Sequence, residues 1–251
     1  MKKINQIIIG GGVSFFKKKM MKKYGLVEYN NIHEPAILNG MYNDNNLRMA
    51  KNHKSHLTIV WCGGDALLYL PKKYNEIKKL KNVRHIAKSE FISNDLKKYG
   101  IEHIILPITG TIPIKNRKDR GENIYVYVDK KRTKKYGCHL LNEIRKKSNK
   151  NIIIADKFTY NETQLNKVYK SCFIGLRLTE HDGLPNTVLE LGLMGRMCVY
   201  NGELPNAIQY NSVDDIIKII NEEYERRHED NQHIVDDMFN YLNIGDNWMI
   251  V

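Results

Sequence analysis

The chain has 251 residues, 42% of them hydrophobic, and carries a formal net charge of +12 at pH 7. This length accommodates one large or two small domains, and the apolar content suffices for a buried core, which argues against a disordered chain. The four cysteines lie far apart and form no Cys-x-x-Cys pair, which argues against a zinc site and against a disulfide scaffold. We therefore expect reduced thiols and a cytoplasmic location.

The positive charge is compatible with three kinds of partner: nucleic acid, an anionic membrane face, or a phosphorylated substrate. The lysines are spread over many predicted helices rather than gathered in one block, so the charge alone does not choose among these partners. No apolar run approaches the ~20 residues that span a membrane. The apolar run at 7–9 is short and ends in glycines, which favours a first strand over a signal peptide.

The first half of the chain alternates predicted strands and helices. Apolar runs predict strands at 6–9, 57–61, 83–87 and 102–106. Helical periodicity predicts helices at 14–23, 74–80 and 93–99, with a glycine turn at 10–12. Strands that are separated in this way by helices imply a parallel sheet.

The helix expected at 14–23 carries an apolar stripe of Phe16, Met20 and Tyr24 beside several lysines. A stripe at this spacing favours a helix that packs on a core and leaves its lysine face in solvent. A basic amphipathic helix can also lie on an anionic membrane, so peripheral membrane contact is the alternative.

A break in the pattern follows at 109–123, where glycine, proline and many charges replace the apolar periodicity, as is typical of a linker. A second series of elements then begins. It comprises predicted strands at 124–128, 151–155, 173–178 and 197–200 and predicted helices at 138–147, 162–169, 213–226 and 233–248. We therefore expect two α/β domains, one over 1–112 and one over 113–251.

The segment from 173 to 200 is the most informative part of the chain. Its apolar strand ends in a polar turn that contains Pro185, and a helix is expected to begin near Thr187 and to carry Glu190 in its first turn. The turn lies at the carboxyl end of a strand, where open α/β sheets bind ligands. Unpaired N–H groups at a helix N-terminus suit a phosphate, and a carboxylate about one turn inward can accept hydrogen bonds from a ribose diol. These features together describe a site for a nucleotide diphosphate, and the alternative is an ordinary helix start at which the dipole favours acids.

The two acids of this segment, Asp182 and Glu190, are separated by seven residues, and Asp182 opens the run Asp-Gly-Leu-Pro-Asn. Arg177 and His181 precede it in the order Arg-x-Thr-x-His-Asp. This arrangement resembles the donor-binding motif of GT-B glycosyltransferases, most closely that of the family 4-like retaining enzymes. Two positions depart from the motif, because Asp182 replaces the usual first Glu and Leu191 replaces the small residue after the second.

The resemblance implies a role for each residue of the motif. Glu190 would hold the donor ribose, Arg177 would lie beside the diphosphate, and Asp182 and His181 would lie near the sugar. The remaining donor-binding residues that it implies form the turn and the start of the helix: Gly183, Leu184, Pro185, Asn186 and Thr187.

The loop after the strand at 124–128 is rich in lysine and arginine. In the family that the chain resembles, a basic pair in this loop, just before a glycine and a helix, grips the donor diphosphate. Arg132 and Lys135 are expected to do so here, although Tyr136 stands where lysine is usual. The alternative is a solvated run of charges. A leaving diphosphate needs cations and N–H donors wherever no metal neutralises it.

The resemblance continues in the first half of the chain and covers about residues 57 to 225. The strand at 57–61 closes on Gly64 and Asp65, as the corresponding strand does in the family. Asp65 is expected to contact donor or acceptor, and the alternative is a helix cap. Gly11, Gly12 and Gly64 would let the backbone approach a substrate on the acceptor side.

The sequence contains no Asp-x-Asp pair, the pattern that marks the metal-dependent alternative transferase fold. We therefore expect no metal and no cofactor, with a nucleotide-diphosphate sugar as co-substrate. The residues expected to be catalytic are Asp182, His181 and Asp65.

The sequence thus predicts a compact GT-B protein of the α/β class, in which two Rossmann-like domains face each other across a cleft and the last helix crosses back to the first domain. The expected function is sugar transfer, with retention, to a glycan, lipid-linked or protein acceptor. Two alternatives are a basic nucleic-acid-binding protein and a GT-B-like protein that binds nucleotide or glycan without turnover. Nucleic acid is disfavoured because zinc spacing, ribonucleoprotein-type aromatic motifs and a recognisable helix-turn-helix are missing from the sequence.

Overall fold

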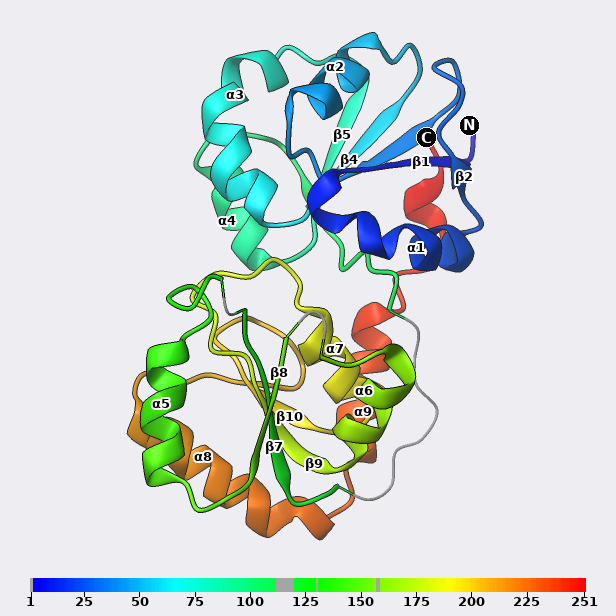
Figure 1. Ribbon diagram of the computed structural model, residues 1–251. Coiled ribbons are helices and arrows are strands. Elements are labelled where there is room, and N and C mark those ends of the chain that lie inside the picture. Colours follow the sequence, from blue (N-terminus) through cyan, green and yellow to red (C-terminus); the bar gives the residue numbers. More distant parts are fainter. Residues whose placement is uncertain (1, 112–119, 130, 157–158) are drawn as a thin grey trace. The chain divides into compact units, whose positions relative to one another are not determined.

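The structure of the protein is a computed structural model that describes residues 2–111, 120–129, 131–156 and 159–251 (Figure 1). By its contacts the chain divides into two compact units. The first unit comprises Met1–Ile112, Asp182–Leu184 and Leu242–Val251, and the second comprises Pro113–His181 and Pro185–Tyr241. Each unit contains its own parallel sheet, which confirms the expected α/β class. Most of the predicted linker, at 112–119, lies outside the described residues.

The first unit is built on a parallel sheet with the strand order β2-β1-β3-β4-β5-β6. Its strands are β1 (Gln6–Ile9), β2 (Val27–Glu28), β3 (Ala36–Asn39), β4 (Leu57–Trp61), β5 (Val83–Ala87) and β6 (Ile104–Ile105). Its helices are α1 (Lys17–Tyr24), α2 (Asp44–Asn52), α3 (Leu70–Ile77) and α4 (Glu90–Lys97), with shorter helical segments at Gly11–Phe16, Asp65–Tyr69 and Asn247–Met249.

The strands of this unit are continuous apolar runs because helices cover both faces of the sheet. Successive side chains of a strand point to opposite faces. Ile8 therefore packs with residues of α2, α3 and α4, whereas Ile7 packs on the other face with Met20 and Tyr24 of α1 and with Trp248. The apolar stripe of α1 thus faces the core, which confirms the core-packed interpretation of that helix.

The second unit is built on a parallel sheet with the strand order β11-β10-β9-β7-β8. Its strands are β7 (Asn123–Tyr127), β8 (Ile152–Ala155), β9 (Cys172–Leu176), β10 (Met197–Val199) and β11 (Ala207–Ile208). Its helices are α5 (Cys138–Lys147), α6 (Glu162–Lys170), α7 (Asn186–Leu193), α8 (Val213–Glu225) and α9 (Gln232–Leu242), with a short segment at Arg226–His228. Figure 1 shows α5 and α8 on one side of the sheet and α6, α7 and α9 on the other.

Three predicted helices have different limits in the structure, each for a local reason. The helix predicted at 74–80 begins at Leu70, and Pro71 occupies its first turn, where the missing N–H has no intrahelical partner to lose. The helix predicted at 93–99 begins at Glu90, directly after the N-cap residue Ser89. The helix predicted at 233–248 ends at Leu242, and Gly245, with a φ of 60°, then turns the chain into a separate short segment.

The elements between residues 25 and 56, namely β2, β3 and α2, were missed by the sequence analysis. β2 has two residues and β3 has four, so neither gives a strong period. In α2 the buried positions are Asn46, Leu47 and Ala50, which give only a weak apolar stripe.

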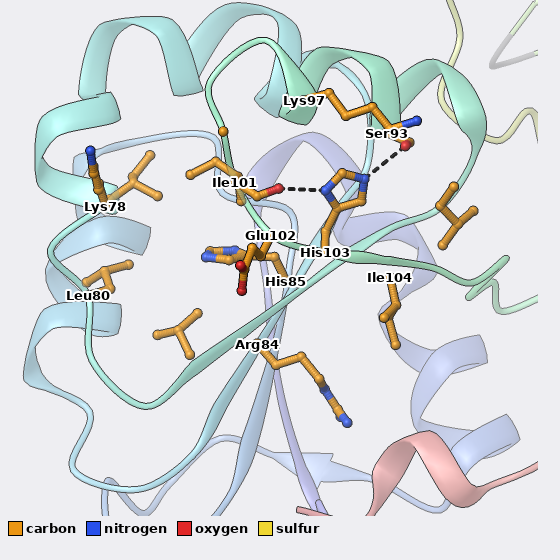
Figure 2. A pocket seen from close by; sticks show the side chains of 14 residues that line it. Lys78, Leu80, Arg84, His85, Ser93, Lys97, Ile101, Glu102, His103 and Ile104 are labelled. Carbon is orange, nitrogen blue, oxygen red and sulfur yellow. Dashed lines mark hydrogen bonds between the residues drawn. The ribbon is translucent and has the colours of Figure 1, made fainter.

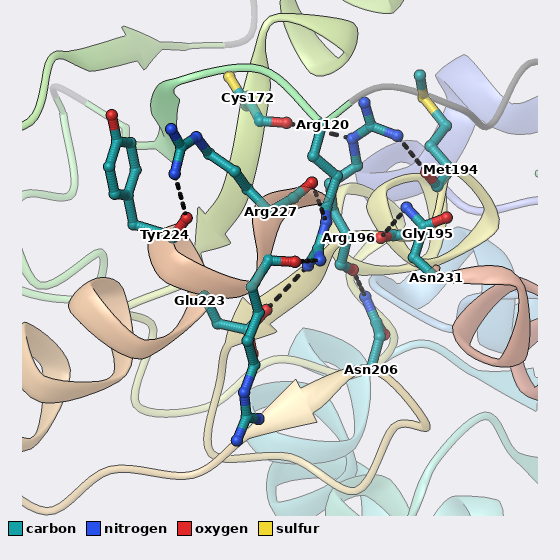
Figure 3. A network of polar contacts seen from close by, with 11 residues as sticks. Arg120, Cys172, Met194, Gly195, Arg196, Asn206, Glu223, Tyr224, Arg227 and Asn231 are labelled. Carbon is teal, nitrogen blue, oxygen red and sulfur yellow. Dashed lines mark hydrogen bonds and ion pairs between the residues drawn. The ribbon is translucent and has the colours of Figure 1, made fainter. Parts of the chain in front are cut away.

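A buried polar network ties together the elements of the second unit around Arg196 (Figure 3). The Arg196 side chain, which is 1% exposed, donates hydrogen bonds to the carbonyl oxygens of Cys172, Lys170 and Met194. The Asn206 amide donates to the carbonyl oxygens of Val188 and Arg196 at 2.9 and 3.0 Å. The bonds to Lys170 and Met194 satisfy carbonyl groups at the carboxyl ends of α6 and α7 that have no intrahelical partner.

A second part of this network joins the start of the described second unit to α8. Arg120 donates to the Glu223 carboxylate at 3.2 Å and to the carbonyl oxygens of Arg226 and Arg227. Both charged side chains are more than nine-tenths buried, so both lose most of their hydration on folding. Their mutual attraction and their hydrogen bonds within the protein offset that loss. Removing one partner of such a pair is therefore strongly destabilising.

We expect Arg196→Met to lower the free energy of unfolding by ~2–4 kcal/mol, because the carbonyl groups that Arg196 bonds would stay buried without a donor. Urea unfolding of the two proteins measures the difference. Arg145→Met, at an exposed position of α5, is the matched control and should change stability by less than ~0.5 kcal/mol. Equal stability of the Arg196 variant and the wild type would contradict the role given to the network.

Candidate functional site

The carboxyl ends of the strands share one edge in the second unit, because all of its described strands run parallel. β9 and β7 are neighbours in this sheet, so the loop after β7 and the loop after β9 leave it side by side. In an open α/β sheet this edge is where ligands bind. The basic loop and the Asp182 to Glu190 motif of the sequence analysis are these two loops.

Arg177 follows β9 and lies beside two tyrosine rings that also pack against each other. Its guanidinium carbon lies 4.8 Å from the centre of the Tyr127 ring and 5.0 Å from the centre of the Tyr136 ring. Tyr127 ends β7, and Tyr136 closes the loop that follows it. A planar guanidinium suits such stacking, which orients its N–H groups before any ligand arrives. Arg177 is only 7% exposed, so its charge acts in a poorly hydrated place.

Arg132 belongs to the same cluster. It forms an ion pair with Asp129, with 2.8 Å between Arg132 Nε and Asp129 Oδ2, and its guanidinium lies 5.3 Å from the centre of the Tyr136 ring. Burial acts to raise the pKa of Asp129, but the bond from Arg132 and the N–H of Lys131 outweigh it and lower that pKa. Lys135 lies half-buried further along the loop. The structure therefore brings Arg132 and Arg177 to one aromatic ring.

Glu190 lies on α7 and is oriented by a buried tyrosine. α7 begins at Asn186 with Pro185 as its N-cap residue, so Glu190 lies at the start of the second turn. The sequence had predicted the first turn. Its Oε2 accepts a hydrogen bond of 2.9 Å from the hydroxyl of Tyr169, which is 1% exposed. Burial and the charge of Glu190 raise the pKa of Tyr169, so this hydroxyl stays a donor.

The turn between β9 and α7 divides between the two units. Asp182–Leu184 count with the first unit by their contacts, whereas His181 and the residues from Pro185 onward count with the second. A Cβ atom on Gly183 would lie 2.2 Å from the carbonyl oxygen of Cys62, so only glycine fits there.

Thr187 is half-buried in the first turn of α7. Pro185 has no side-chain donor or acceptor, so it does not cap the first N–H groups of the helix.

Asp65 is fully buried at the carboxyl edge of the first sheet, and backbone groups surround its carboxylate. Its oxygens accept hydrogen bonds from the N–H groups of Met41, Cys62, Gly63 and Ala66, at distances of 2.8 to 3.0 Å. Burial raises the pKa of Asp65, and these N–H groups act in the opposite direction. The geometry favours a structural role, in which Asp65 joins the segments that follow β3 and β4.

Two of the three predicted acceptor-side glycines, Gly12 and Gly64, lie against the ring of Tyr42. A Cβ atom on Gly12 would lie 3.0 Å from this ring, and one on Gly64 would lie 3.7 Å from it. Gly40, with a φ of 88°, lies against the same ring. Gly11 is exposed, and a Cβ atom there would meet open space. Packing against Tyr42 therefore explains the absence of a side chain at Gly12 and not at Gly11.

Four tyrosines that contact predicted site residues were not themselves predicted as site residues: Tyr42, Tyr127, Tyr136 and Tyr169. One signal was present, since Tyr136 stands in the basic loop where the family has lysine. The chain contains 15 tyrosines, so composition alone could not select these four.

A cavity of about 890 Å³ lies elsewhere in the first unit, beside the amino-terminal half of β5 (Figure 2). β6 pairs only with Ile86 and Ala87, which leaves the outer edge of β5 open from Val83 to His85. None of the predicted site residues lines this cavity. The residues that line it are Ile77, Lys78, Leu80, Val83, Arg84, His85, Ser93, Lys97, Gly100, Ile101, Glu102, His103, Ile104 and Ile105.

Two histidines of the cavity are fixed by hydrogen bonds. His85 Nδ1 accepts a bond of 3.2 Å from the indole N–H of Trp61. His103 bonds the hydroxyl of Ser93 at 2.9 Å and the carbonyl oxygen of Ile101 at 2.7 Å, and Figure 2 shows both bonds. Burial, followed by the charge of His103, lowers the pKa of His85 to about 4. His85 is therefore neutral at pH 7, which its bond from Trp61 requires.

Within the described ranges of the chain, no helix is long and apolar enough to span a bilayer. No group of three histidine, cysteine, aspartate or glutamate side chains among those residues is arranged to hold a metal ion. The four cysteines are unpaired thiols.

No family model matches the chain, and no curated protein matches it in sequence. Solved structures do match it. The pneumococcal O-GlcNAc transferase GtfA, in complex with UDP and GlcNAc, aligns with a TM-score of 0.55 at 14% identity, over 92% of this chain and 57% of GtfA. The lipopolysaccharide outer core galactosyltransferase WaaB aligns with a TM-score of 0.55 at 13% identity, over 93% of this chain and 78% of WaaB.

A TarM variant from S. aureus, in complex with fondaparinux, alpha-GlcNAc-glycerol and UDP, aligns with a TM-score of 0.52 at 14% identity, over 83% of this chain and 55% of TarM. The chain thus spans little more than half the length of GtfA and of TarM. These likenesses show that the chain has the fold of GT-B glycosyltransferases. At such identities they show the fold alone.

The pKa of His85 makes stability depend on pH. Because this pKa is lowered from 6.5 to about 4, the folded chain binds fewer protons than the unfolded chain between these two values, and stability falls as the pH falls through them. We expect His85 to account for a loss of ~1–2 kcal/mol in the free energy of unfolding between pH 7 and pH 5, measured by urea unfolding.

His85→Asn tests this assignment, since asparagine retains an acceptor for the Trp61 indole and does not titrate. Its stability should fall less between pH 7 and pH 5 than that of the wild type. His33→Asn, at an exposed position, should keep the wild-type dependence. An unchanged dependence in the His85 variant would remove this histidine as the cause.

Proposed function

We propose that the chain is a glycosyltransferase that moves a sugar from a nucleotide-diphosphate donor to an acceptor hydroxyl. One observation supports the proposal: Arg177, next to the tyrosine that ends β7, and α7, which carries the tyrosine-bonded Glu190, both follow β9 in the second unit. The GT-B fold supports it, and so do GtfA and TarM, whose structures hold UDP. The activity, donor and acceptor are proposals for this chain.

Glu190 would bind the donor ribose. A carboxylate can accept hydrogen bonds from both hydroxyls of a vicinal diol, and it does so best when its direction is fixed. Tyr169 supplies that constraint, because its buried hydroxyl bonds Oε2 and fixes the direction of the carboxylate. Tyr169 packs edge-on against Tyr125, with 4.9 Å between the ring centres, so the tyrosine itself has little freedom.

Arg177, Arg132 and Lys135 would neutralise the donor diphosphate together with the first N–H groups of α7. A leaving diphosphate gains negative charge as the glycosidic bond breaks, and donors already aimed at it lower the barrier. Arginine binds phosphate oxygens through two parallel N–H groups, which fixes the orientation of the leaving group. We propose metal-independent chemistry on the strength of these cations.

At the sugar end, Asp182 and His181 are the proposed contacts, and the proposed stereochemical course is retention. The bond between the sugar carbon and the phosphate oxygen breaks, the acceptor oxygen attacks the same face, and its proton passes to the departing phosphate. No enzyme nucleophile takes part in this route. The proposed acceptor is a glycan, a lipid-linked sugar or a protein, on which the geometry of the second unit has no bearing.

We expect Glu190→Gln to weaken donor binding about 10- to 100-fold, because a charged acceptor of ribose hydrogen bonds is lost. Calorimetry with UDP-, GDP- and ADP-sugars measures the affinity. Tyr169→Phe keeps the carboxylate and frees its orientation, so a smaller loss is expected. Glu225→Gln, at an exposed position of α8, is the matched control and should bind as the wild type does. Absence of binding in the wild type, or equal binding by Glu190→Gln, would refute the site; binding without transfer would indicate a non-catalytic protein.

We expect Arg177→Lys to weaken donor binding about tenfold while the fold is retained. An ammonium group keeps the charge but cannot offer a planar face to Tyr127 and Tyr136 or bond two phosphate oxygens in a plane. The same calorimetric titration measures the effect, with Arg145→Lys on α5 as the control for loss of an arginine. Unchanged affinity in Arg177→Lys would place the diphosphate away from this guanidinium.

A further inference from the structure

The carboxyl edge of the first sheet carries polar groups that the donor site does not use. β3, β4 and β5 are neighbours in this sheet, and all run in one direction. β3 ends at Asn39, Cys62 follows β4, and Lys88 and Ser89 follow β5. The four residues therefore stand along one edge, within the first unit.

Lys88 is a buried cation at this edge, with 7% of its surface exposed. Its ammonium group shares a hydrogen bond with the thiol of Cys62. Burial raises the pKa of Cys62 to about 12, and Lys88 acts in the opposite direction. Within the part of the chain that the structure describes, no carboxylate forms an ion pair with Lys88. A buried ammonium needs such a partner, because desolvation of an unpaired charge is expensive.

Two other side chains at the edge each have a buried polar atom without a hydrogen-bond partner. Asn39 is fully buried, and its Nδ2 has no hydrogen-bond acceptor among the described residues, whereas its Oδ1 lies 3.5 Å from the Cys62 thiol. Ser89 is 9% exposed, and its Oγ has no partner among those residues either. Ser89 occupies the N-cap position of α4 without capping it, whereas Asn43 and Ser212 do cap α2 and α8.

These groups share one chemical character. The Lys88 ammonium and the Asn39 amide are donors, and the Ser89 hydroxyl can donate as well. A buried polar group without a partner costs ~1–3 kcal/mol, so native proteins usually bond such a group to protein, to water or to a ligand. A ligand that satisfies three donors, one of them charged, is an oxyanion.

We propose that this edge of the first unit binds an anionic group, a phosphate or a carboxylate, that belongs to the sugar acceptor. The assignment of the anion to the acceptor rests on the proposed function, whereas the anion site itself rests on Lys88, Asn39 and Ser89 alone. Lys88 supplies the charge, and the other two supply directed hydrogen bonds. The net charge of +12 draws anions to the protein from solution. A neutral acceptor would leave the Lys88 charge uncompensated.

The test is calorimetric titration of the full chain with three probes on one sugar ring: glucose 6-phosphate, glucuronate and glucose. We expect at least one charged probe to bind at least tenfold more tightly than glucose, and the stronger of the two identifies the anion. Lys88→Met should weaken that probe at least tenfold, and Ser89→Ala should weaken it several-fold. Lys97→Met, at an exposed position of α4, is the matched control and should bind as the wild type does. Equal binding of the charged probe by Lys88→Met and Lys97→Met overturns the proposal, as does the absence of binding by any charged probe.

UDP-sugar titrations on the same proteins separate this inference from the proposed function. Donor binding without anion binding refutes the inference and leaves the function standing, whereas loss of both refutes both. If Lys88→Met weakens the UDP-sugar and not the charged probe, Lys88 serves the donor and the proposal fails. Lys88→Arg keeps the charge and must therefore bind the charged probe as the wild type does. If Lys88→Met does not fold, Lys88→Arg and Ser89→Ala replace it in the test.

Discussion

The parallel direction of the strands is the constraint on which both units of this protein depend. Parallel strands bring all their carboxyl ends to one edge, and the connections between them must be long enough to carry a helix. Helices then cover both faces of each sheet, which is why strands such as β4 are apolar throughout. The same constraint brings Arg177 and the loop of Arg132 together, since β9 and β7 are neighbours that end at the same edge.

Aromatic rings orient the charged groups of the candidate donor site. Arg177 lies against the rings of two tyrosines, and Glu190 is bonded to a third. A ring has few rotatable bonds and large contact area, so it fixes a long charged side chain at a small loss of entropy. The polar network around Arg196 also restricts motion in the second unit, because it holds the last turn of α7 and the start of β9 in place. Buried donors thus set the positions of the elements that carry the ligand-binding groups.

The sequence predicted the parts of the fold that have a strong local signal. Strands β1, β4, β5 and β7 were found within one residue because each is an apolar run bounded by polar residues or glycine. The elements β2, β3 and α2 were missed because they are short or bury few apolar side chains. The pattern from Asp182 to Glu190 located the start of α7, but the helix begins at Asn186, so Glu190 lies one residue further into it than expected.

The sequence by itself determined the α/β class, the alternation of strands and helices, and the position of the acid-rich turn, since each of these depends on neighbours within a few residues. Only the tertiary structure decided which groups those residues meet. Tyr169 meets Glu190 from another helix, and Asp65 is surrounded by N–H groups from two loops. Such contacts follow from strand order and burial, which local spacing does not encode. For this reason the same kind of carboxylate is held by a tyrosine side chain at Glu190 and by backbone N–H groups at Asp65.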